Sequence, residues 1–202
     1  MQGGGLTQFS ATVLNLLAWY RLKHQLDRND EVVAEYAVTG SWSLKAAEEG
    51  QRMGAKAKMV IDARKEGNGK FTSIPKLSEW EMESQISNST QRKPAFIYYC
   101  DNETVDGVEF PAVTTDDRQA FPIESIDPEV PIVCDMSSNF LSRPVDISKY
   151  GIIYAGAQKN LGPAGVSVII IREDLLGESR SPWSLLCMKL TTFFSQSTRI
   201  SR

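Results

Sequence analysis

The sequence has little of the residue types on which most metal and nucleophile chemistry depends. One histidine and three cysteines occur among its 202 residues, and the cysteines have no close spacing. A structural zinc site needs about four His or Cys ligands, and a Ser-His-Asp triad needs a histidine beside its serine. With His24 as the lone histidine, we expect neither a metal site nor such a triad.

Long apolar runs and an excess of positive charge are also lacking. The formal net charge is −3, which gives no electrostatic reason to expect nucleic acid or an anionic membrane as a partner. No apolar run approaches the length of a membrane span, and residues 1–5 lack the charge-then-apolar order of a signal peptide. An odd number of cysteines (Cys100, Cys134, Cys187) favours free thiols in a reducing compartment. We therefore predict a cytoplasmic protein.

What is present suits a folded α/β domain. Hydrophobic residues make up 42% of the chain and charged residues 23%, and the length suffices for one domain with a substantial core. Helices are expected at residues 10–20, 44–54 and 75–85. Short apolar segments, rich in β-branched residues and bounded by glycine, proline or polar residues, predict strands. These segments are residues 31–38, 58–62, 94–100, 131–135, 151–154 and 166–171.

Lys159 lies in a turn of small residues and glycines between the last two of these strands. Small neighbours let a planar ligand approach, and partial desolvation would lower the pKa of the lysine toward that of a nucleophilic amine. Such an amine forms a Schiff base with a carbonyl, and pyridoxal phosphate is the common biological partner. The alternative is an ordinary lysine in a surface turn.

Three other features invite a ligand, and each has a structural alternative. The glycines at residues 3–5 enter a predicted helix and could cradle a phosphate, or they could be a flexible tail. Trp42 follows a predicted strand and could stack on a flat ring, or it could pack a helix onto the sheet. Asp135 ends a predicted strand and could pair with a protonated ring nitrogen, or it could cap the following turn.

Together these features match the four chemical handles of pyridoxal phosphate: a phosphate, an aromatic ring, a basic ring nitrogen and an aldehyde. The aspartate would keep the ring nitrogen protonated, so that the ring could act as an electron sink. The lysine would hold the aldehyde, then be released and move a proton between the amino-acid α-carbon and the cofactor.

At these residues the sequence resembles the phosphoserine aminotransferases, which are class V aminotransferases of the type I pyridoxal-phosphate fold. The matching motifs cover residues 2–5, 39–43, 102–110, 134–146 and 155–165. Gln158 is the discriminating residue, because related desulfurase-like enzymes place a histidine there to stack on the ring. In this chain the resemblance leaves that role to Trp42.

The resemblance implies a role for each of seven residues. Lys159 is expected to form a Schiff base with the cofactor, Asp135 to pair with the pyridinium nitrogen, and Trp42 to stack on the ring. Thr104 is expected to form a hydrogen bond near the ring hydroxyl. The phosphate is expected to be contacted by the backbone of Gly5 and Leu6 and by the side chain of Gln158.

The resemblance also implies an architecture and a reaction. Residues 1–176 are expected to form the large domain of the family, with a mostly parallel mixed sheet and helices on both faces. The small C-terminal domain is expected to be absent, with residues 177–202 as a tail unlike the family. The implied homodimeric enzyme converts 3-phosphohydroxypyruvate and glutamate to phosphoserine and 2-oxoglutarate, in serine biosynthesis. The alternative is a truncated, non-catalytic form that at most binds the cofactor or a partner subunit.

Overall fold

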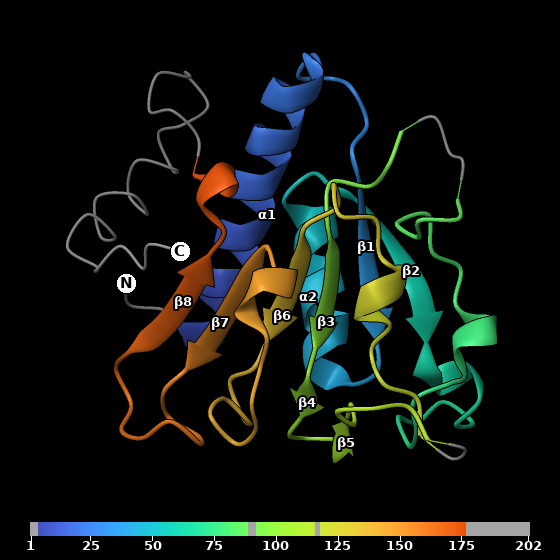
Figure 1. Cartoon of the computed structure of the whole chain (residues 1–202), viewed down its shortest axis with the longest axis vertical. Helices are drawn as coiled ribbons and strands as arrows, with labels where there is room; N and C mark the ends of the chain where they lie inside the picture. Colours follow the sequence, from blue (N-terminus) through green and yellow to red (C-terminus); the bar gives the residue numbers. More distant parts are fainter. Residues whose placement is uncertain (1–3, 89–91, 116–117, 177–202) are drawn as a thin grey trace.

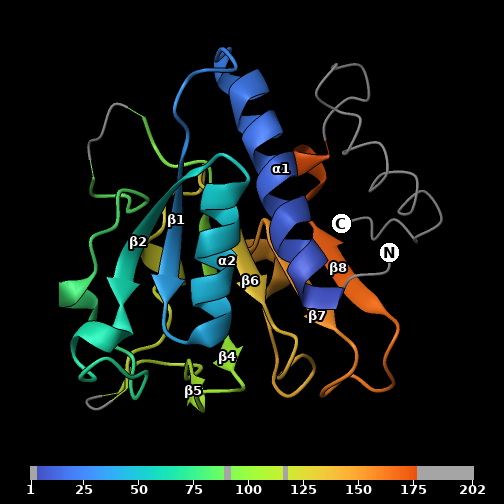
Figure 2. The ribbon, with the colours of Figure 1, turned by 180° about the vertical axis from the view of Figure 1, so that it is seen from behind.

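Two helices and a six-stranded sheet make up the two main layers of the computed structural model, which describes residues 4–88, 92–115 and 118–176 (Figure 1). The helices are α1 (Gly4–His24) and α2 (Ser41–Arg52), and both lie on the same face of the sheet (Figure 2). Neither helix is both long and apolar enough to cross a membrane. The predicted boundary at residue 177, the tail after it and Cys187 fall outside the described residues.

The sheet is mixed but mostly parallel, with the strand order β2-β1-β3-β6-β7-β8. Its first five strands in that order are parallel, and the edge strand β8 runs antiparallel to β7. The bounds are Val33–Val38 for β1, Lys56–Asp62 for β2, Ile97–Cys100 for β3, Ile132–Asp135 for β6, Ile152–Gly156 for β7 and Ser167–Ile171 for β8. A small antiparallel hairpin is formed by β4 (Asn102–Glu103) and β5 (Val108–Glu109).

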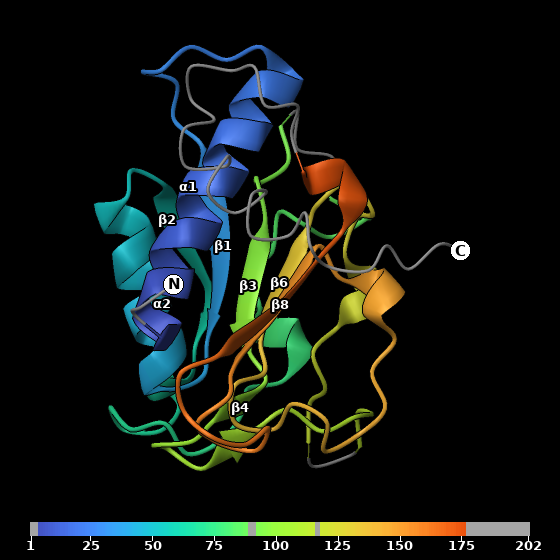
Figure 3. The ribbon, with the colours of Figure 1, turned by 90° about the vertical axis from the view of Figure 1, so that its left-hand side faces the viewer.

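The predicted α/β fold with a mostly parallel mixed sheet is confirmed, but the prediction of helices on both faces is wrong for the described residues. Figure 3 shows α1 and α2 together on one side of the sheet. The opposite face is covered by loops and 3₁₀ turns, which bury a second hydrophobic cluster including Trp80, Phe110 and Phe121. Both faces of the central strands are therefore buried, which explains why their sequences are continuous apolar runs.

The helix predicted for residues 75–85 is also wrong. Only a 3₁₀ turn, Leu77–Glu79, forms there. The chain beyond it is held by tertiary hydrogen bonds, because the Glu81 N–H donates to the Val60 carbonyl and the Ser84 N–H donates to the Glu35 carboxylate. These bonds replace the local ones that a helix would need, and Trp80 is buried without a helix around it.

The topology brings the ends of four parallel strands to one edge of the sheet. Because β1, β3, β6 and β7 run in the same direction, the segments that follow them meet there. In open α/β sheets, ligands bind at this carboxyl edge. The segments that follow these strands carry Trp42, Thr104, Ser137 and Lys159, four residues that are far apart in the sequence.

Candidate active site

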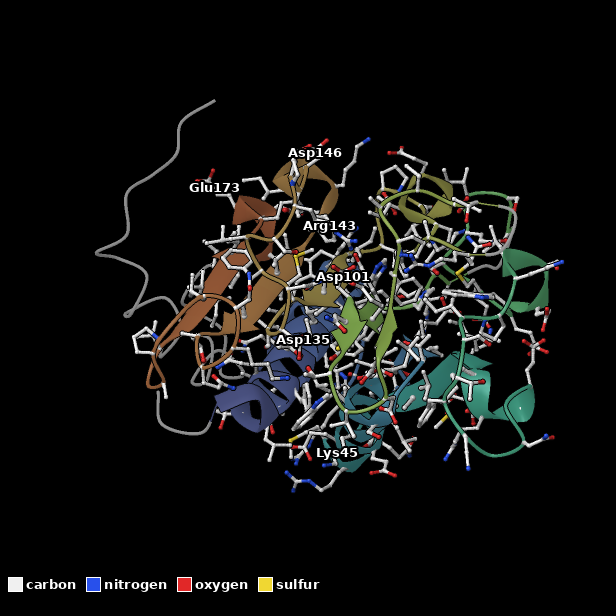
Figure 4. The ribbon with its side chains drawn as sticks, turned by 90° about the horizontal axis from the view of Figure 1, so that it is seen from below. Lys45, Asp101, Asp135, Arg143, Asp146 and Glu173 are labelled. Carbon is white, nitrogen blue, oxygen red and sulfur yellow. The ribbon has the colours of Figure 1, made fainter. Side chains whose placement is uncertain are left out.

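A cavity of about 210 Å³ opens at the carboxyl edge of the sheet. Its walls come from the first turn of α1, the start of α2, the ends of β3 and β6, and the β7–β8 turn. The lining residues are Gly5, Leu6, Phe9, Trp42, Cys100, Asn102, Asp135, Ser137, Ser138, Gln158 and Lys159. Figure 4, which views the molecule from this edge, shows Asp135 between α1 and the β4–β5 hairpin.

Lys159 projects from the β7–β8 turn, where Gly162 and Gly165 adopt positive φ angles of 153° and 106°. Its side chain is half-buried, and its Nζ donates a hydrogen bond to the Thr104 hydroxyl at 2.5 Å. The same Nζ lies 5.4 Å from the centroid of the Trp42 ring. The lysine therefore lies on the cavity wall, close to groups from two other segments.

Asp135, the last residue of β6, lies on the same cavity with only 6% of its surface exposed. Its Oδ1 accepts the Ser137 N–H at 2.8 Å, so the turn-capping interpretation of this residue holds. Burial raises the pKa of the Asp135 carboxyl, and the hydrogen bonds from Ser137 and the charge of Lys159 oppose that rise only in part. No cation of the described chain lies within ion-pair distance of it, so a cationic ligand atom would give this carboxylate a direct ionic partner.

Trp42 lies in the first turn of α2, where it serves both of the roles that the sequence left open. Its ring packs against the core cluster between the helices and the sheet, and it also lines the cavity. The Lys45 Nζ lies 4.8 Å from the ring centroid, in addition to that of Lys159. The indole Nε1 is buried and has no hydrogen-bond partner among the described residues.

The first turn of α1 leaves room for an anion. It contains no acidic residue, and a Cβ added at Gly5 would meet no other atom of the described residues within 4 Å. Leu6, which also lines the cavity, is 59% exposed. Gln158 folds back over Gly156, where a Cβ would lie 2.7 Å from its Oε1. A helix N-terminus with free N–H groups attracts negative charge, so a phosphate fits here.

The structure therefore brings six of the seven predicted residues onto one cavity, and the seventh, Thr104, contacts Lys159 directly. Sequence reasoning missed five lining residues: Phe9, Cys100, Asn102, Ser137 and Ser138. The two serines follow Asp135 closely in the sequence, which was an available signal. The Ser137 Oγ accepts the Gly156 N–H at 3.0 Å and the Ser138 Oγ donates to the Asn102 carbonyl at 2.8 Å, so both join neighbouring strand ends.

These groups fit pyridoxal phosphate. The buried carboxylate of Asp135 suits a protonated ring nitrogen, the indole of Trp42 suits a flat ring, and the amine of Lys159 suits an aldehyde. The open start of α1 suits the phosphate. The cavity contains a distinct chemical group for each handle of that cofactor.

Comparison with known protein families gives a match over most of the chain. The family described as Aminotransferase class-V matches residues 8–199. Phosphoserine aminotransferase of Drosophila melanogaster is 44% identical over 178 residues, which are 88% of this chain and 40% of that protein. Phosphoserine aminotransferase of Saccharomyces cerevisiae is 42% identical over 176 residues, which are 87% of this chain and 40% of that protein. The chain thus spans about 40% of the length of these curated relatives.

Solved structures agree with the sequence comparison. A phosphoserine aminotransferase from Bacillus circulans subsp. alkalophilus superposes with a TM-score of 0.70 at 33% identity, covering 96% of this chain and 45% of that one. A phosphoserine aminotransferase with bound pyridoxal phosphate, from Trichomonas vaginalis, superposes with a TM-score of 0.67 at 32% identity. This second match covers 99% of this chain and 47% of the Trichomonas chain.

Proposed function

The chain belongs to the class-V aminotransferases, and on that premise we propose that it transfers an amino group between glutamate and 3-phosphohydroxypyruvate to give phosphoserine and 2-oxoglutarate. The observation that carries the proposal is the position of Lys159 on a cavity that also presents Asp135 and Trp42. The choice of substrate is supported by relatives at 42–44% identity that are named phosphoserine aminotransferases.

Pyridoxal phosphate, when bound, supplies an electron sink conjugated to the reacting amino group. The Lys159 Nζ is the group that would hold the cofactor aldehyde, and its free amine would move a proton at the α-carbon of the substrate. Its contact with the Thr104 hydroxyl and its position near the Trp42 ring orient this amine. The Asp135 carboxylate, which lines the same cavity, would hold a proton on the ring nitrogen.

The remaining roles concern binding. Trp42 covers one face of the cofactor ring and excludes water from it. The backbone of Gly5 and Leu6 and the side chain of Gln158 bind the phosphate at the start of α1. Thr104, whose hydroxyl accepts a hydrogen bond from the lysine amine, would hydrogen-bond near the ring hydroxyl.

The first test is the visible absorption of the purified chain during titration with pyridoxal phosphate. The unmodified chain is expected to gain a visible band, and Lys159→Ala is expected to lose it. Lys45→Ala is the matched control, since Lys45 also faces the Trp42 ring but lies outside the cavity lining, and it is expected to keep the band. Borohydride reduction followed by peptide mapping should place the attached cofactor on Lys159. An equal band in the Lys159→Ala chain would contradict the proposal.

Substrate choice is tested on the loaded chain. Phosphoserine is expected to remove the band and to release the matching oxo acid. Serine, which lacks the phosphate, is expected to react at least about tenfold more slowly, since a site built for a polar group rejects an analogue without it. Equal rates for the two amino acids would contradict the assignment of a phosphorylated substrate.

A second candidate is a chain that binds the cofactor without turnover. The observation that favours it is that Lys159 is the sole cationic side chain among the described residues that line the cavity. Arg143 is already paired with Asp101 through two hydrogen bonds of 2.7 and 2.6 Å, so it offers no free guanidinium for bidentate binding of a substrate carboxylate. A visible band that phosphoserine leaves unchanged would favour this candidate.

We also propose that the active form is a homodimer with the cavity at the interface between subunits. Large apolar side chains are exposed on the loops at the carboxyl edge: Val105 on the β4–β5 hairpin, Leu141 after β6 and Val166 in the β7–β8 turn. Exposed apolar groups of this kind mark interaction surfaces. Light scattering on the loaded chain should give the mass of two chains, and a monomer at every concentration would contradict this.

A further inference from the structure

The β4–β5 hairpin closes the N-terminus of α2 with two carboxylates. The N–H groups of Trp42 and Ser43 each donate to an oxygen of Glu103 at 2.8 Å. The Ser41 N–H donates to Asp106 at 2.6 Å, and the Ser41 hydroxyl donates to the other oxygen of Asp106 at 3.1 Å. Three of the four N–H groups that a helix start leaves without an intrahelical partner are thus bound by a segment 60 to 65 residues further along the chain.

Glu103 takes the place of a local capping side chain. The N-cap residue of α2 is Gly40, which has no side chain to offer. A Cβ at Gly40 would lie between 2.3 and 2.6 Å from side-chain carbons of Glu103, so the glycine makes room for this carboxylate. Glu103 is fully buried and forms no ion pair with any described residue. The helix N–H groups and the helix dipole therefore offset its charge in part, although burial still raises the pKa of this carboxyl.

The same hairpin reaches the reacting lysine. Thr104 directly follows Glu103, and its hydroxyl accepts the hydrogen bond from the Lys159 Nζ. Trp42, whose backbone N–H is bound by Glu103, presents its ring to the same Nζ at 5.4 Å. The Ser138 Oγ donates to the Asn102 carbonyl, which joins the hairpin to the loop after Asp135.

We propose that Glu103 is a positioning residue, whose carboxylate fixes the start of α2 against the β4–β5 hairpin and so sets the Trp42 ring and the Thr104 hydroxyl around Lys159. Glu103 does not line the cavity, so it acts through these two residues. The inference rests on the proposed function, because the arrangement matters for a cofactor held between Trp42 and Lys159. A merely structural Glu103 would affect folding without changing how the cofactor is held.

Glu35 provides a matched control for this distinction. It is also a fully buried glutamate, and its oxygens accept the Glu83 N–H at 2.6 Å and the Ser84 N–H at 3.1 Å. It lies on β1, and the cavity lining does not include it. In both Glu103→Gln and Glu35→Gln one accepting oxygen is kept and an NH₂ group is set against a backbone N–H. Glu35 also pairs with Lys58 at 3.4 Å, so its variant should lose at least as much stability.

The experiment measures the affinity for pyridoxal phosphate, the circular dichroism of the bound cofactor in the visible range, and the thermal stability. Both variants are expected to lose stability. Glu103→Gln is expected to raise the cofactor Kd about tenfold and to diminish the visible dichroism, since a hydrogen bond to a charged group contributes about 1.5–3 kcal/mol. Glu35→Gln is expected to leave both cofactor signals within about twofold of those of the unmodified chain.

Asp106→Asn supports the test if Glu103→Gln fails to fold. Asp106 is half-buried and binds the Ser41 end of the same helix start, so its variant is expected to raise the cofactor Kd about threefold with reduced dichroism. Equal losses of cofactor binding in Glu103→Gln and Glu35→Gln, or an unchanged dichroism in Asp106→Asn, would overturn the positioning role of Glu103 and leave the proposed function standing. An unmodified chain without a Lys159-dependent band would instead contradict the proposed function, and the inference with it.

Discussion

Two helices begin at the carboxyl edge of the sheet, and their N-termini differ in what occupies them. At α2 the chain supplies its own anions, since Glu103 and Asp106 bind the N–H groups of the first turn. At α1 no acidic residue lies in the first turn, and the space beside Gly5 is open to the cavity. The same physical feature, a positive helix end, is therefore closed in one helix and left available in the other.

This difference assigns the two ends to different tasks. The closed end of α2 holds Trp42 by its backbone and so fixes the ring that faces Lys159. The open end of α1 is free to take the phosphate of a ligand. A glycine precedes or begins each helix, so the glycine alone does not reveal the task. The task of each helix end is revealed by the side chains that pack against the glycine.

The largest expected effect comes from adding one methyl group at each helix start. Gly40→Ala is expected to cost about 3 kcal/mol of stability, because the new Cβ would overlap the Glu103 side chain. Gly5→Ala is expected to gain up to about 1 kcal/mol, because its Cβ meets open space and alanine favours a helix. Denaturant unfolding of both variants measures the contrast. Equal changes in stability would remove the proposed difference between the two ends.

A smaller effect is expected from the hydroxyl that the closed end brings to Lys159. Thr104→Val keeps the shape of the side chain but removes the acceptor for the Nζ. Affinity for pyridoxal phosphate is expected to fall about fivefold, which corresponds to the loss of a hydrogen bond worth about 1 kcal/mol. Spectroscopic titration gives the value, with Thr104→Ser as the variant that should retain the original affinity. A Thr104→Val chain with unchanged affinity would show that this contact does not hold the lysine in the loaded site.

The smallest expected effect concerns Asp135, which the open cavity leaves without a cation. Burial raises its folded-state pKa above the ordinary value of 3.8, so its ionised form opposes folding at neutral pH. Asp135→Asn is therefore expected to raise the melting temperature of the ligand-free chain at about pH 7. This gain should shrink as the pH falls through the raised pKa of the folded state toward the ordinary value of 3.8. Calorimetry at about pH 7 and about pH 4 measures the difference in melting temperature between the variant and the unmodified chain. A gain independent of pH would exclude the ionised carboxylate as its cause.

Much of the fold and of the site could be predicted from the sequence because both depend on short segments with strong signals. The apolar runs before Asp135 and before Lys159 are the strands β6 and β7. β6 ends at Asp135, and Gln158 and Lys159 follow the end of β7 closely, so polar residues at both strand ends line the cavity. A parallel sheet then places those ends along one edge without further information. Trp42 and Gln158 reach the same cavity for that reason, whereas Gly5 reaches it from the start of α1.

The parts that could not be predicted depend on contacts between distant segments. Glu35 binds the N–H groups of residues 83 and 84 in a non-helical path, which replaces the helix expected at residues 75–85. The start of α2 lies at Ser41 rather than near residue 44, because its N–H groups are bound by Glu103 from the hairpin. Glu35 and Glu103 both lie far in the sequence from the N–H groups that they bind, so no local sequence pattern indicates these hydrogen bonds.

The central claim is that the open end of α1 holds the phosphate of pyridoxal phosphate. The most direct test is Gly5→Asp, titrated with pyridoxal phosphate and with pyridoxal, which lacks the phosphate. An aspartate in the first turn should stabilise the free helix by about 0.3–1 kcal/mol, yet it should repel the phosphate and weaken binding of pyridoxal phosphate about 100-fold. Binding of pyridoxal should change by no more than about twofold. Equal weakening of both ligands, or no change in either, would contradict the account.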